Sequence, residues 1–116
     1  DHMQKIGSLR SINPYNPWLG MWTTIVRRPR GMDEPLHPEQ SLSREQALQL
    51  YSINNAYLTF EEKEKGSLEP GKLADFVVLQ QDYVQCPVDE IRDIAVSQTW
   101  LGGKRIYAAD ASAGKP

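Results

Sequence analysis

The sequence is short of the residues from which disulfides, metal sites and membrane spans are built. Its 116 residues include one cysteine, Cys86, and two histidines, His2 and His37. A single cysteine cannot close an intrachain disulfide or form a zinc knuckle alone, so we interpret Cys86 as an inert thiol in a reducing compartment. No stretch approaches the roughly 18 apolar residues of a membrane span, and the N-terminus lacks the pattern of a signal peptide. These absences predict a cytoplasmic protein without a membrane partner.

An excess of basic charge is also missing. The chain has 13 Lys and Arg residues against 15 Asp and Glu residues, which leaves a net charge of −2. A protein that holds a phosphate backbone needs a positive field, so we expect no nucleic-acid partner. The hydrophobic content of 40% is typical of one soluble domain. A closed (β/α)8 barrel needs about 250 residues, so this length excludes one.

A first helix is predicted from about Pro17 to Arg28. Asn16 suits the N-cap and Pro17 the first helical position, and Pro29 ends the helix. Arg27 and Arg28 then fall in the last turn, where cations favour the helix dipole. Apolar residues at spacings of three and four form one wide face: Trp18, Leu19, Met21, Trp22, Ile25 and Val26.

Residues 31–42 form an irregular loop in this interpretation, with two prolines and a glycine. His37 lies in the loop without another ligand at metal-binding spacing, so we interpret it as a solvated histidine. A weaker alternative is that the basic cluster from Arg27 to Arg30 binds an anion. We nominate no catalytic, cofactor-binding or metal-binding residue, because no pocket can be inferred for the nearby surface carboxylates Asp33, Glu34, Glu39 and Glu45.

A second helix is predicted from Ser43 to about Leu58. Ser43 and Gln46 have the spacing of a capping box, in which each side chain hydrogen bonds the other residue's backbone N–H. We expect Asn54 to be buried and to anchor a neighbouring loop or carbonyl, since it interrupts an otherwise apolar stripe. The stripe consists of Ala47, Leu50, Tyr51, Asn54, Tyr57 and Leu58.

The second half of the chain predicts turns and strands. The charged run 61–65 is interpreted as a solvated helix end or connection, and Pro70-Gly71 fits the centre of a type II turn. The apolar run from Ala74 to Leu79 predicts a strand covered on both faces. One helical turn at 88–91 follows.

A hairpin closes the predicted fold. Strands at 94–101 and 104–107 flank the two-residue signal Gly102-Gly103. The fold class is therefore α+β, with two main helices packed on a small, mainly antiparallel sheet. We divide the chain into an N-terminal extension at 1–12, a single α+β domain at 13–107 and a flexible tail at 108–116. Asp1, His2 and Met3 are interpreted as a cloning scar.

Several of these motifs together resemble a known family. The stretch from Ser43 to Gln80 is similar to the C-terminal region of the amidohydrolase superfamily, and most closely to its amidohydrolase-3 branch. The strongest element is GSLEPGKLADFVVL, from Gly66 to Leu79. Further similarity extends over nearly the whole chain, in the helix with Asn54 and Ala56, the hairpin at 94–107 and the segment from Asn16 to Met21. The resemblance implies the last barrel helices and the small β-domain of such a hydrolase.

The resemblance also implies metal-assisted hydrolysis of carbon–nitrogen bonds other than peptide bonds. The family uses a divalent metal such as zinc, held by several histidines and a carboxylate at the ends of barrel strands. This chain has no His-x-His motif, and Leu9 stands where the family's Gly-Ser-Asp segment has its Asp. We therefore expect no metal or other cofactor in this chain, because leucine can neither bind a cation nor accept a proton.

Two functions remain open. The first is a truncated C-terminal portion of a metal-dependent amidohydrolase that is catalytically inactive on its own. Whether the chain is a natural short protein or an excised fragment stays open, and so does the question of whether it is an enzyme. The second is a small oligomerising interaction module derived from a hydrolase. It predicts a homo-oligomer such as a homodimer, formed through exposed apolar helix faces and by exchange of the helix that carries Trp18 and Trp22.

Overall fold

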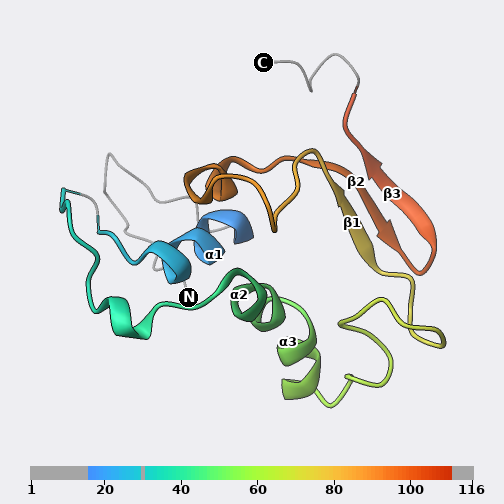
Figure 1. Cartoon of the computed structure of the whole chain (residues 1–116). Coiled ribbons are helices and arrows are strands. Elements are labelled where there is room, and N and C mark those ends of the chain that lie inside the picture. Colours follow the sequence, from blue (N-terminus) through green and yellow to red (C-terminus); the bar gives the residue numbers. More distant parts are fainter. Residues whose placement is uncertain (1–15, 30, 111–116) are drawn as a thin grey trace, which may run out of the picture.

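The computed structural model describes residues 16–29 and 31–110 (Figure 1). The expectations for Leu9, for the extension at 1–12, for Arg30 and for the last six residues lie outside this range. Two lobes are visible in Figure 1, with the helices on one side and a twisted sheet on the other. The α+β class and the antiparallel sheet are confirmed.

Helix α1 spans Pro17–Val26, and Asn16 caps it as predicted. The Asn16 Oδ1 atom accepts hydrogen bonds from the backbone N–H of Trp18 at 2.9 Å and of Leu19 at 3.4 Å. The helix ends before the two arginines, so their predicted place in its last turn was wrong. The reason is local: Arg27 adopts a left-handed conformation with φ of 52° and donates its N–H to the carbonyl of Thr23.

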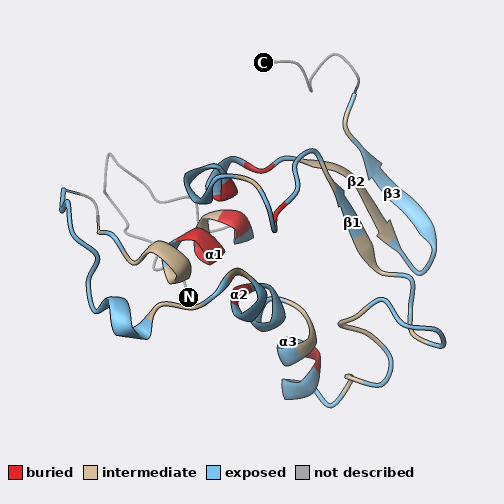
Figure 2. Cartoon of the chain, viewed as in Figure 1, coloured by how far each residue is buried: buried red, intermediate tan, exposed pale blue. Residues whose placement is uncertain are grey.

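The core lies where α1 meets the 3-10 helix η2, Val88–Asp93. Trp22 joins the two elements, since its Nε1 donates to the Asp89 carboxylate at 3.2 Å and the Arg92 guanidinium lies 4.8 Å from its ring centre. Figure 2 shows the buried positions gathered around α1 and η2. The buried cluster consists of Trp18, Met21, Trp22, Ala47, Tyr83, Ile91 and Ile94.

The predicted second helix is two helices, α2 at Arg44–Leu50 and α3 at Ile53–Leu58. The capping box of Ser43 and Gln46 is confirmed. A single helix to Leu58 was wrong because the chain bends at Ser52, whose hydroxyl donates to the carbonyl of Leu48 at 2.7 Å. Such a bond back to the preceding turn bends helices.

The expected burial of Asn54 was also wrong. After the bend, α3 turns Ala56 towards the rest of the chain, and Asn54 is exposed. Most of the predicted apolar stripe is exposed with it, while Ala47 is fully buried. Apart from Ala47, the stripe therefore does not contribute to the chain's own core.

The sheet has the order β1-β2-β3, with β1 at Phe76–Leu79, β2 at Val96–Leu101 and β3 at Lys104–Ala108. Both neighbouring pairs are antiparallel. The expectation that the first strand is covered on both faces was wrong, because Val77 and Val78 are 45% and 39% exposed. The sheet joins the core through Leu79 and Val96, which pack against the buried cluster.

The turn predictions hold in detail. Gly102 and Gly103 have φ of 57° and 77°, as a type I′ hairpin turn requires. In the loop before β1, the N–H of Lys72 donates to the carbonyl of Glu69 at 3.1 Å, and Gly71 has φ of 91°. These values are those of a type II turn with Gly71 at its third position.

Candidate functional site

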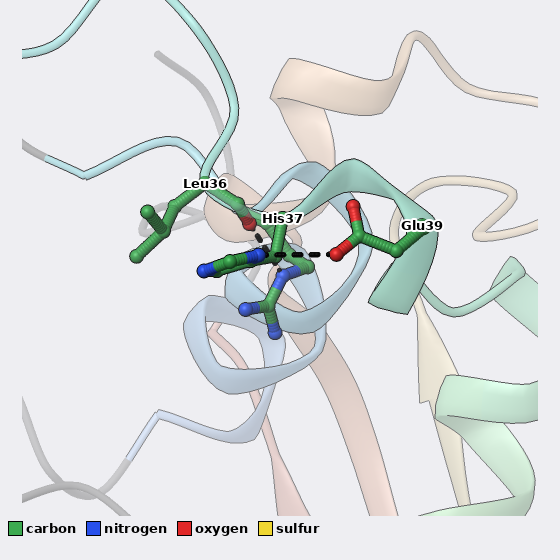
Figure 3. Close-up of polar contacts among 4 residues, drawn as sticks. Leu36, His37 and Glu39 are labelled. Carbon is green, nitrogen blue, oxygen red and sulfur yellow. Dashed lines mark hydrogen bonds and ion pairs between the residues drawn. The ribbon is translucent and has the colours of Figure 1, made fainter.

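The candidate site is the loop between α1 and α2, which carries His37. Two reciprocal hydrogen bonds join Arg27, just after α1, to Leu36 in the loop. Leu36 donates its N–H to the carbonyl of Arg27 at 2.7 Å, and Arg27 Nε donates to the carbonyl of Leu36 at 2.8 Å. Figure 3 shows the Leu36 carbonyl directed at the guanidinium group. The loop is also tied to α1 at its far end, where Leu42 donates its N–H to the carbonyl of Thr24. These bonds give an exposed loop a defined shape.

His37 directly follows Leu36 in the sequence, and its side chain pairs with that of Glu39. The distance between His37 Nδ1 and Glu39 Oε1 is 3.0 Å, and the two side chains face one another in Figure 3. His37 has φ of 49° and starts the short 3-10 helix η1, Pro38–Gln40, which turns Glu39 back towards the ring. A carboxylate at this position fixes the orientation of the imidazole ring.

The surroundings of the pair limit what it can do chemically. The side chains of His37 and Glu39 are 61% and 64% exposed, so water competes for both groups. A solvated loop histidine was the prediction, and the exposure confirms it. The sequence analysis missed Glu39 as its partner, and the available signal was the His-Pro-Glu spacing, which a 3-10 turn brings together.

The other candidate residues are separate from this pair. Asp33, Glu34 and Glu45 are exposed, and so is Glu39. Exposure leaves these carboxylates in water, whereas an acid–base site needs a desolvated environment. Two arginines of the proposed anion-binding cluster already have partners in the chain. Arg27 donates to the carbonyl of Leu36, and the Arg28 guanidinium lies 3.5 Å from the Asp89 carboxylate.

Cys86 lies in the turn at 82–86, where its N–H donates to the carbonyl of Asp82 at 2.9 Å. It is half-buried against the core, and the Arg44 guanidinium beside it donates to the carbonyls of Tyr83 and Val84 at 2.8 and 2.9 Å. The Tyr83 hydroxyl donates in return to the carbonyl of Arg44 at 2.7 Å, and burial raises the pKa of Tyr83. This reciprocal arrangement fixes the start of α2 to the 82–86 turn.

The donor groups of the described residues form no site for a divalent cation. Across residues 16–29 and 31–110, no three side chains of His, Cys, Asp or Glu come together as ligands of one metal ion would. His37 and Glu39 supply one pair, whereas a zinc site needs at least three protein ligands. No helix in the described part of the chain is long and apolar enough to cross a membrane.

Comparison with known families gives the relationship of the whole chain. The model of the Amidohydrolase family matches residues 10–107. The chain belongs to the amidohydrolase family. The resemblance identified from the sequence motifs is therefore confirmed, and the match covers helices α1 to α3 and the hairpin up to residue 107.

Individual amidohydrolases and related proteins support the assignment. An N-substituted formamide deformylase of Arthrobacter pascens is 35% identical over 108 residues, which are 90% of this chain and 20% of the relative. Protein LONG AFTER FAR-RED 3 of Arabidopsis thaliana is 34% identical over 105 residues, or 88% of this chain and 17% of the relative. The chain thus spans about a fifth of the length of these relatives.

A solved amidohydrolase shares the fold. The crystal structure of an amidohydrolase from Thermotoga maritima MSB8 superposes with a TM-score of 0.51 and 24% sequence identity. The superposition covers 61% of this chain and 17% of that one.

Proposed function

We propose that this chain is the C-terminal portion of a metal-dependent amidohydrolase acting on carbon–nitrogen bonds other than peptide bonds, and that it is catalytically inactive alone. The observation that carries the proposal is the family match over residues 10–107 within a chain that spans about a fifth of its relatives. The relative named for deformylation of N-substituted formamides favours a carbon–nitrogen bond as the target. A cytoplasmic location belongs to the same proposal.

In this proposal a divalent cation such as zinc is bound by residues outside the described part of the chain. The one histidine in that part pairs with Glu39 on an exposed loop, and the donor set there is too small for a catalytic cation. The chain's own contribution is structural: it supplies helices α1 to α3 and the small sheet.

Metal content and hydrolysis of the purified chain test the proposal. The chain is loaded with zinc, dialysed and analysed for bound metal, and its hydrolysis of simple N-substituted formamides is measured. We expect substoichiometric zinc and no turnover above that of free zinc. His37→Ala is the matched control, since it removes the described histidine without altering the core. Stoichiometric zinc together with turnover would overturn the proposal.

The second candidate function is an oligomerising interaction module. It is favoured by a specific observation: several large apolar side chains of α3 and its surroundings are open to solvent, including Tyr57, Leu58, Phe60 and Leu68. Light scattering over a range of protein concentrations tests it. A molar mass equal to that of the monomer at every concentration would remove this candidate.

A further inference from the structure

The segment from Gly66 to Asp75 carries most of the strongest family motif, and the proposed function assigns it no role. Drawn in yellow-green in Figure 1, it leads from the turn after α3 to the start of β1. The backbone of Gly66 lies directly against Ala56 of α3. Farther along, Leu73 donates its N–H to the carbonyl of Glu64 at 2.8 Å, which ties the segment to the same turn. We call residues 66–75 the strap.

The last residues of the strap hold the turn between β2 and β3. Gly103 donates its N–H to the carbonyl of Ala74 at 3.0 Å, and Gly102 donates its N–H to the Asp75 carboxylate at 2.7 Å. The sheet joins the core at the opposite end of β1. The strap therefore secures the end of the sheet that is farther from the core.

A lysine with little exposure lies inside the strap. The Lys72 side chain is 12% exposed, and its Nζ donates to Ser67 Oγ at 2.7 Å and lies 3.0 Å from Glu69 Oε2. Ser67 donates its hydroxyl to the same carboxylate oxygen, so the three side chains contact one another. A cation that has lost most of its water is stable only where such partners replace it. We call Ser67, Glu69 and Lys72 the clasp.

Apolar packing contributes little to closure of the strap. Its two leucines, Leu68 and Leu73, are 70% and 50% exposed. Closure therefore depends on the clasp and on the backbone hydrogen bonds at each end. Local opening in proteins involves contiguous segments of this kind, which have few buried apolar contacts and open as cooperative units.

We propose that the strap opens and closes as one unit under the control of the clasp. When the clasp opens, the hydrogen bond of Leu73 beside α3 and that of Gly103 in the hairpin turn are lost together. The strap thereby couples the order of the turn after α3 to the order of the hairpin. This inference concerns the conformation of the chain and goes beyond the proposed hydrolase assignment.

Amide hydrogen exchange of the whole chain, followed by NMR, tests the coupling. The double variant Ser67→Ala with Glu69→Ala leaves the Lys72 ammonium without either partner. The protection factors of the Leu73 and Gly103 N–H groups should then both fall at least about tenfold. Adding Lys72→Met removes the stranded charge and keeps an apolar side chain in its place, so both protection factors should recover.

Two further variants complete the design. Asp75→Ala removes the acceptor of the Gly102 N–H, and in a single unit the protection of Leu73 falls as well, although its own acceptor is intact. Glu39→Ala is the matched control, because the Glu39 side chain is 64% exposed, against 62% for Glu69, and lies in another loop. It should leave protection of the strap unchanged. The amides of α1 report whether each variant remains folded.

Each outcome decides the inference. Loss of protection at both Leu73 and Gly103 in the double variant, with recovery in the triple variant, supports it. Loss at Leu73 alone, or at neither, overturns the single unit, and a triple variant without recovery overturns the buried charge as the cause. If the double variant also loses protection in α1, the Asp75→Ala variant decides: a fall at Leu73 with α1 intact supports the inference, and an unchanged Leu73 overturns it.

Discussion

Replacement of Gly66 by alanine should destabilise the fold more than any other substitution of a single loop glycine in the described chain. Gly66 opens the segment that leads to β1, and it passes directly over α3. A Cβ atom added there would lie 2.8 Å from the Cβ of Ala56 and 3.0 Å from the Cα of Ile53. The second contact involves backbone, so relief requires α3 or the loop to move. Gly66 also has φ of 97°, which strains any L-residue.

The expected magnitude has two parts. Left-handed backbone strain costs about 1 to 3 kcal/mol, and forcing a methyl group into filled space costs about 1 to 3 kcal/mol more. Gly71→Ala isolates the first part, because Gly71 has φ of 91° but no atom within 4 Å of the added Cβ. We therefore expect Gly66→Ala to lower the free energy of unfolding by about 1 to 3 kcal/mol more than Gly71→Ala does.

Urea titration followed by tryptophan fluorescence measures both variants, since Trp18 and Trp22 lie in the core. Circular dichroism of each variant checks that helix content is preserved before the comparison. The double variant Gly66→Ala with Ala56→Gly removes the shortest contact and should recover part of the loss. If Gly66→Ala and Gly71→Ala lower the free energy of unfolding equally, the steric contact of the added Cβ with α3 is refuted. Backbone strain would then account for the whole loss.

Two further predictions concern the core and its pH dependence. Met21→Ala should lower the free energy of unfolding by about 2 to 5 kcal/mol in urea titration, because Met21 is 2% exposed; a loss below about 1 kcal/mol would contradict its place in the core. Burial raises the pKa of Tyr83 above its usual 10.0, so the folded state holds this proton more tightly. Stability from this group is therefore fully present below pH 10 and is lost as the pH rises through the folded pKa. Thermal unfolding from neutral to alkaline pH should show this loss in the wild type and less of it in Tyr83→Phe, and identical profiles would contradict the assignment.

Local features were predictable because their causes lie within a few residues. The capping box of Ser43 and Gln46 depends on side chains three positions apart, and the Gly102-Gly103 turn on freedom at positive φ. The family was also predictable, since the run from Gly66 to Leu79 combines a turn and a strand in a specific order.

Features that depend on a distant partner were not predictable. Periodicity indicates that the stripe with Asn54 has an apolar side, but it cannot say whether this chain covers that side. The His37 and Glu39 pair is local instead, and it was missed because the turn that joins the two residues requires the left-handed backbone of His37. The sequence contains few histidines and cysteines but 15 Asp and Glu residues, and only the arrangement of side chains decides which of them meet.

By itself, the sequence determined the element types, the turns and the membership of the amidohydrolase family, since these follow from short-range backbone preferences and motif order. The tertiary structure decided which apolar faces become core. It buried the α1 face against η2 and left Tyr57 and Leu58 of α3 in solvent, because the bend at Ser52 turned Ala56 inward instead of Asn54. Burial is a property of the whole packing arrangement, and no local pattern contains it.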